Sequence, residues 1–109
     1  MEFNDVSTIA IYVIEVLKEF VSLARGSIVT FSTGRVTKVI QRRFAPPLEE
    51  SLLTAKVRDI LTSLADKGLI EIVYRKHHKT IYAIKRCSKF WHDLASLDTK
   101  TIYVKYILQ

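Results

Sequence analysis

LTAKVRDILTSLADKGLIEIVYRKHHKTIYAIK, residues 53–85, changes its hydrophobic period halfway along. In the first half, apolar residues return every three or four positions, which is the spacing of one helix face. Beyond Gly68, β-branched and aromatic residues flank a polar tip at 75–78, and this pattern predicts an antiparallel hairpin with strands over 69–74 and 79–85. Because the tip contains neither glycine nor asparagine, we expect a longer loop there rather than a two-residue turn.

A first helix is predicted between Asp5, which can cap its start, and Gly26, which can stop its end. Its main apolar stripe keeps helical spacing, but further apolar residues fall off that stripe: Tyr12, Ile14, Val16 and Leu23. A helix that is apolar on more than one side covers more than one neighbour. The second neighbour is either the partner subunit of a homodimer or the C-terminal tail of the same chain.

A short strand and two helices are predicted between this first helix and the hairpin. The strand is the β-branched stretch 27–31, and the second helix follows it over 32–44, with a hydroxyl side chain as its cap. Two prolines within 45–47 break the chain, because proline lacks an amide donor and disfavours helical geometry in the residue before it. The third helix then begins at 48–50 and ends at Gly68, with acidic side chains in its first turn.

The C-terminal residues have a less regular pattern. Ser88 is placed to cap a short helix over 89–97. The stretch KTIYVKYIL at 100–108 is rich in β-branched and aromatic residues, so we expect it to form a strand. A continuing helix that serves oligomerisation is the alternative.

The totals indicate one domain of 109 residues, with a net charge of +6 and nearly half of its residues apolar. The single cysteine, Cys87, cannot form an internal disulfide, which suits a reducing cytoplasm. The N-terminal residues do not have the pattern of a signal peptide, and charged residues interrupt the most apolar run. We therefore expect a cytoplasmic protein that does not enter a membrane.

Positive charge is concentrated in two segments that contain no acidic residue. Residues 35–43 carry Arg35, Lys38, Arg42 and Arg43, and residues 75–89 carry Arg75, Lys76, Lys79, Lys85, Arg86 and Lys89. Charge that served only solubility would be scattered along the chain. Its segregation instead predicts that the basic residues gather on one side of the molecule, where they would face a polyanion such as nucleic acid.

Residues 53–85 resemble the third helix and hairpin of archaeal and bacterial winged helix-turn-helix transcription factors, in which a V..IL..L...GLI stretch precedes a basic hairpin. The resemblance extends more loosely over 5–86. It implies an α+β fold with a three-helix core and a β-hairpin wing over 1–87, followed by a C-terminal extension over 88–109. In that family the third helix enters the major groove and the wing contacts the DNA backbone or minor groove.

The resemblance and the charge pattern together predict a sequence-specific regulator of transcription that binds double-stranded DNA as a homodimer. Arg58 is the best candidate for reading a base, because its planar fork matches the O6/N7 edge of guanine. The complete set of expected DNA contacts is Arg35, Lys38, Arg42, Arg43, Ser51, Thr54, Arg58, Arg75, Lys76, His77, His78 and Lys79. The alternative is a winged-helix module for protein interactions in a replication, transcription or cell-division assembly, and the acidic start of the third helix favours it.

Other classes of function find little support in the sequence. His77 and His78 are adjacent, so on a strand they would point to opposite faces and could not bind one metal ion together. Their expected role is either to gain charge near a phosphate or simply to be solvated. No glycine-rich phosphate loop or nucleophile motif is present. We therefore expect no enzyme activity, no cofactor and no small-molecule ligand.

Overall fold

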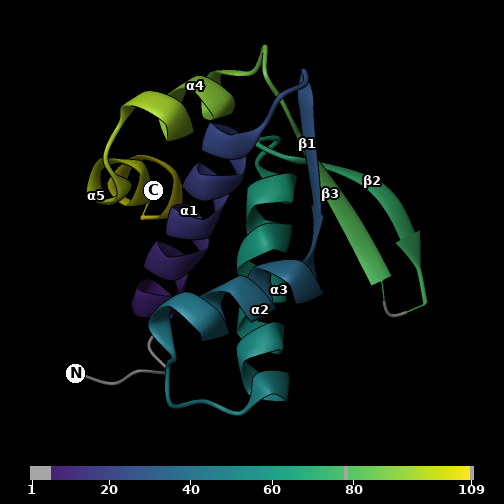
Figure 1. Cartoon of the computed structure of the whole chain (residues 1–109), viewed down its shortest axis with the longest axis vertical. Helices are drawn as coiled ribbons and strands as arrows, with labels where there is room; N and C mark the ends of the chain where they lie inside the picture. The colour runs from purple at the N-terminus through teal and green to yellow at the C-terminus, as the bar shows by residue number, and fades with distance from the viewer. Residues whose placement is uncertain (1–5, 78, 109) are drawn as a thin grey trace.

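The computed structural model describes residues 6–77 and 79–108. They contain five α-helices, a three-stranded antiparallel sheet and a terminal π-helix (Figure 1). In chain order they are α1 (Val6–Leu23), β1 (Ile28–Ser32), α2 (Thr33–Phe44), α3 (Glu50–Asp66), β2 (Glu71–Lys76), β3 (Lys79–Lys85), α4 (Lys89–Ser96), α5 (Thr99–Ile102) and η1 (Tyr103–Ile107). The α+β class and the predicted order of elements are thus confirmed as far as α4. Asp5, the expected cap of α1, lies outside the described residues.

The sheet has the order β1-β3-β2, so β3 lies between the other two strands. Phe31 of β1 lies opposite Tyr82 of β3, and both rings are buried against the core. Because side chains alternate along a strand, the next pair, Ser32 and Ile81, belongs to the other face of the sheet. We call this second face, on the side of Ser32 and Ile81, the outer face.

The hairpin between β2 and β3 is tighter than predicted. Lys76 lies opposite Lys79, so only two residues separate the strands, and the expectation of a longer loop was wrong. His77 makes the tight connection possible by taking a positive φ of 54°, which is uncommon for a residue other than glycine. The pairing of β2 with β3 is also interrupted by a bulge between Ile72 and Tyr74.

Helix α1 occupies the centre of the core. It packs against α2 and α3 and also against α4, α5 and η1, which lie together on its other side (Figure 1). Ile14 and Val16, which fall off its main apolar stripe, are therefore buried within the chain. Burial within the chain accounts for these two residues without a partner subunit. Leu23, at the end of α1, remains 71% exposed.

Local hydrogen bonds fix the two ends of α2. Its cap is Ser32, whose Oγ accepts a hydrogen bond from the backbone N–H of Arg35 at 3.1 Å. The helix ends at Ala45, which takes a left-handed φ of 44° and donates its N–H to the carbonyl of Gln41. Helix α3 is likewise followed by Gly68, whose φ of 77° suits glycine. The left-handed turn at Ala45 ends α2 just before the two prolines that separate it from α3.

The C-terminal stretch is helical, and the prediction of a strand over 100–108 was wrong. Asp98 caps α5, because its Oδ1 accepts a hydrogen bond from the N–H of Thr101 at 2.7 Å. Ile102 is fully buried in the core, and the hydroxyl of Tyr103 donates to Ser7 of α1 at 2.9 Å. Capping and burial therefore outweigh the strand propensity of these residues, which is a weak preference.

A buried carboxylate ties η1 to α4. Asp93 of α4 accepts a hydrogen bond from Lys105 Nζ at 2.8 Å and another from the hydroxyl of Tyr106. These hydrogen bonds hold the pKa of Asp93 below its ordinary value. Burial, helped by Asp93, raises the pKa of Tyr106. The extension predicted over 88–109 is consequently a packed layer on α1 in its described part.

Among the described residues, no helix is both long enough and apolar enough to cross a membrane.

Candidate nucleic-acid interface

The basic residues of α2 form a row on the side of the helix that faces solvent and the end of α1. Arg35, Lys38 and Arg42 are exposed and line one hollow together with Glu19 and Leu23 of α1. Within the described chain, Lys38 and Arg42 have no acidic group at ion-pair distance. Two positive charges of this row are thus available to an external anion.

The β2–β3 hairpin, which we call the wing, presents a second group of basic side chains beside the beginning of α2. Lys76, His77 and Lys79 line a hollow with Tyr74 and Thr80 of the same hairpin. The rest of its wall comes from the start of α2, namely Ser32, Thr33 and Gly34. Backbone N–H groups in the first turn of a helix carry partial positive charge and attract anions. The lysines and the first turn of α2 therefore both attract an anion to this hollow.

Ser32 and Gly34 belong to both hollows and so join the two groups into one surface. We call it the α2–wing surface: Arg35, Lys38 and Arg42 of α2 with Lys76, His77 and Lys79 of the wing. The structure thus places Arg35, Lys38 and Arg42 next to Lys76, His77 and Lys79. Glu19 is the only acid that lines either hollow among the described residues, and Arg43 already pairs with it at 3.2 Å.

Arg75 lines neither hollow of this surface. It lies opposite Thr80 in the hairpin. Because side chains alternate along a strand, both residues are on the core face of the sheet, the face of buried Tyr82. Lys76 and Lys79 lie opposite each other and are on the outer face of the sheet, like Ile81. The wing therefore carries basic side chains on both of its faces. His78, the remaining wing contact predicted from the sequence, lies outside the described residues.

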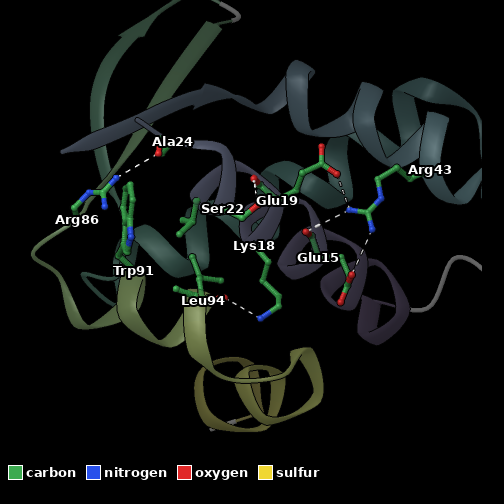
Figure 2. Close-up of a pocket in the computed structure, with 11 residues that line it drawn as sticks. Glu15, Lys18, Glu19, Ser22, Ala24, Arg43, Arg86, Trp91 and Leu94 are labelled. Atoms are coloured by element: carbon green, nitrogen blue, oxygen red, sulfur yellow. Dashed lines mark hydrogen bonds and ion pairs between the residues drawn. The ribbon is translucent and has the colours of Figure 1, made fainter. Parts of the chain in front are cut away.

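Arg43 forms ion pairs with acidic side chains, which Arg35, Lys38 and Arg42 do not within the described residues. It reaches α1, where its guanidinium pairs with Glu15 at 3.5 Å and with Glu19 at 3.2 Å (Figure 2). It also stacks over the ring of Phe44, 4.9 Å from the centroid. These contacts turn Arg43 away from the row of Arg35, Lys38 and Arg42, so the structure does not bring it into the α2–wing surface.

Arg86 is held in a similar way at the other end of the hollow that Figure 2 shows. Its Nε donates to the carbonyl of Gly26 at 3.0 Å, and its guanidinium stacks over Trp91 at 4.9 Å. Lys18, in the same hollow, donates to the backbone carbonyl of Leu94 at 2.8 Å. The cations of this hollow therefore have partners within the chain, and we do not assign it to a ligand.

The expected base-reading residues lie on α3. Ser51 and Arg58 are exposed and Thr54 is half-buried, so all three are accessible to some degree. None of them lines a hollow of the α2–wing surface among the described residues. Leu52, next to Ser51, is 44% exposed, and Glu50 stands in the first turn of the helix. The structure thus brings basic side chains of α2 and the hairpin together and leaves the residues of α3 as a separate group.

The sequence did not identify the hydroxyl-rich junction between the two basic groups as part of a site. Thr33 is 7% exposed, and its hydroxyl oxygen is buried without a hydrogen-bond partner among the described residues. Ser32 and Thr33 were singled out only as helix caps. The available signal was the run Ser-Thr-Gly immediately before a basic helix, which becomes meaningful only once β1 is known to pair with β3.

No group of three or more His, Cys, Asp or Glu residues within the described part of the chain is arranged to hold a metal ion. No protein-family model matches the chain, and no curated protein or solved structure is significantly similar to it.

Proposed function

We propose that this protein is a sequence-specific regulator of transcription that binds double-stranded DNA through a winged-helix domain and acts as a homodimer. The observation that carries the proposal is the α2–wing surface. Six positions of two segments distant in sequence form one basic surface, and the acid that borders it is already paired. Affinity for duplex DNA arises mainly from such contacts with phosphates.

The arrangement of elements supports the winged-helix part of the proposal. A winged helix has three helices and a hairpin, and its first strand joins the sheet beside the hairpin. Here β1 comes between α1 and α2 and pairs with β3, the second strand of the hairpin. In this architecture α3 is the helix that enters the major groove.

The two groups of residues would then have different roles. Lys38, Arg42 and Lys79 would bind phosphates and fix the position of the protein on the duplex, without selecting a sequence. Arg58, exposed on α3, would contact guanine and contribute about 1–3 kcal/mol of discrimination. Two copies would address the two halves of a palindromic site, about one helical turn apart.

Salt dependence is the first test of the proposal. If about 6–10 phosphates are contacted, affinity falls by about 10³–10⁵ between about 50 and 200 mM salt. Fluorescence anisotropy with labelled duplexes, together with selection of bound sites from a random pool, measures affinity, preference and symmetry. Affinity that hardly changes over this range of salt would contradict the proposal.

Variants test the division of roles. Lys79→Ala should weaken binding to every duplex alike and reduce the salt slope by about 0.9, the contribution of one phosphate. Arg58→Ala should reduce the preference between sequences at one position and leave binding to random duplex nearly unchanged. Lys100→Ala removes an exposed lysine of the C-terminal layer and serves as the control. Equal effects of Lys79→Ala and Arg58→Ala would refute the division.

A module for protein interactions is the second candidate, and the beginning of α3 favours it. Glu49 and Glu50 are exposed beside the 44% exposed Leu52, and carboxylates at this end of the helix would repel phosphates. A gel-shift experiment with random duplex at low salt separates the two candidates. Absence of a shift at micromolar protein would favour the interaction module.

A further inference from the structure

Strand β2 leaves one edge of the sheet open. It is the last strand in the order β1-β3-β2, and each of its six residues is exposed. Three consecutive apolar residues in it have large exposed fractions, namely Ile72 at 37%, Val73 at 54% and Tyr74 at 48%. An open edge offers unpaired backbone groups to another strand, and exposed apolar residues beside it add affinity for a partner.

The sequence of β2 is complementary to itself in one antiparallel register. When the two-fold axis passes between Val73 and Tyr74, Val73 of each copy lies opposite Tyr74 of the other. Glu71 then lies opposite Lys76, and Ile72 lies opposite the aliphatic stem of Arg75. Opposite charges and aromatic–aliphatic pairs are the favourable cross-strand combinations.

This register also agrees with the faces of the strand. Glu71 lies opposite Ala83 of β3 and Lys76 opposite Lys79, which are positions of the outer face. Ile72 and Arg75 lie opposite Tyr82 and Thr80, which are positions of the core face. The bulge at Val73 is what makes these faces match, because it adds one residue between the two halves of β2.

We propose that the edge strand β2 is the surface through which two copies of this chain associate, forming a continuous six-stranded sheet. Bulges and lysines on an edge normally discourage foreign strands. Here they make the edge selective, because a fitting strand needs an acid opposite Lys76 and apolar residues opposite Val73 and Tyr74. A second copy of β2 meets both requirements.

The dyad of such a pair is perpendicular to the sheet, so the outer faces of both copies point to the same side. Lys79 of each copy would therefore face the same direction. Glu71 would lie between Lys76 of the second copy and Lys85 of the same chain, whose Nζ is 3.3 Å from the Glu71 carboxylate. The free protein would associate in this way without DNA, so the association is tested in the absence of DNA.

Sedimentation equilibrium over a range of protein concentrations measures the association. The wild type is expected to form a reversible dimer. Val73→Lys introduces a charge next to the dyad, where it would meet the same charge of the second copy, and should raise the dissociation constant by at least about tenfold. Val104→Lys makes the same change at a 45% exposed position of η1 and should leave the dimer unchanged.

Charge reversal tests the register itself. Glu71→Lys and Lys76→Glu should each weaken self-association by about tenfold, because each places like charges opposite each other twice. A mixture of the two variants should dimerise again, since each then supplies the charge that the other lacks. Circular dichroism confirms that every variant is folded before it is compared.

Three results would overturn the proposal. The first is a wild type that stays monomeric at millimolar concentration. The second is a dimer that Val73→Lys and Val104→Lys leave equally intact. The third is a mixture of the two charge-reversed variants that associates no better than either alone.

Discussion

Replacing Asp93 by alanine should loosen the C-terminal layer of the protein. The side chain of Asp93 is 13% exposed and accepts hydrogen bonds from Lys105 and Tyr106 of η1. A hydrogen bond to a charged group contributes about 1.5–3 kcal/mol when it is shielded from water and much less when it is exposed. Lys105 is 38% exposed, so we assign most of the effect to Tyr106 and expect a loss of about 2 kcal/mol. For a chain of this size that lowers the melting temperature by about 8 °C.

The pH dependence of this effect follows from the directions of the pKa shifts. The pKa of Asp93 is lowered by its hydrogen bonds, so its stabilisation is present above the ordinary carboxyl pKa of about 4. That stabilisation is lost as the pH falls through the lower pKa of the folded state. The pKa of Tyr106 is raised, so its part is present below about pH 10 and is lost as the pH rises through the higher folded value.

Thermal and urea denaturation of the wild type and Asp93→Ala at several pH values measure this difference. It should be constant between about pH 5 and 9 and shrink in acid and in strong alkali. Asp59→Ala, which removes an exposed aspartate from α3, is the control and should change stability by less than about 0.5 kcal/mol. A stability difference within that limit at neutral pH, or one that does not shrink in acid, would refute the assignment.

Four further variants test individual contacts. Arg43→Ala should reduce the free energy of unfolding by about 1 kcal/mol and leave DNA affinity nearly unchanged. Arg42→Ala should weaken DNA binding and leave stability nearly unchanged. Urea denaturation measures the stability and fluorescence anisotropy the affinity. Ala45→Gly should raise the free energy of unfolding by about 0.5–1 kcal/mol, because glycine takes the left-handed φ of 44° without strain. His77→Gly should stabilise the tip of the wing for the same reason, and faster hydrogen exchange of the β2 and β3 amides would contradict this.

Local patterns in the sequence were sufficient for most of the fold. Helices α1 to α3 were predicted because apolar residues such as Leu53, Val57 and Leu64 return with helical spacing and are buried in the structure. The tight connection at His77 was missed, because its left-handed backbone is a conformation that composition does not predict for histidine. It accompanies the pairing of Lys76 with Lys79 across the hairpin.

The C-terminal helices show how a cap can outweigh propensity. Residues 100–108 contain the β-branched and aromatic side chains that favour a strand, but Asp98 precedes them with a carboxylate placed to accept the N–H of Thr101. Ile102 and Tyr106 then lie four residues apart, on the side that contacts the core and Asp93. The aspartate three residues before a threonine was the signal for a helix, and weighing it above strand propensity would have given the correct structure.

Charge alone could not separate the cations that face solvent from those used inside the molecule. Arg42 and Arg43 are neighbours in sequence, yet only Arg43 meets the carboxylates of Glu15 and Glu19. The difference arises from the packing of α2 against α1. This packing turns the side of α2 that carries Arg43 toward the acidic side chains of α1 and leaves the side that carries Arg42 facing solvent. A basic segment therefore predicts that a surface exists, and packing decides which of its members belong to it.

The convergence of α2 and the wing has a simple covalent cause. Ser32 is both the last residue of β1 and the cap of α2, so the helix begins where the strand ends. β1 pairs with β3 in a register that places Ser32 opposite Ile81, two residues from Lys79. The first turn of α2 is thereby fixed beside the tip of the wing, whichever exposed side chains the chain carries there. Because a shift of one residue in this register would send Lys79 to the core face, the buried pair Phe31 and Tyr82 also determines which cations share the outer face.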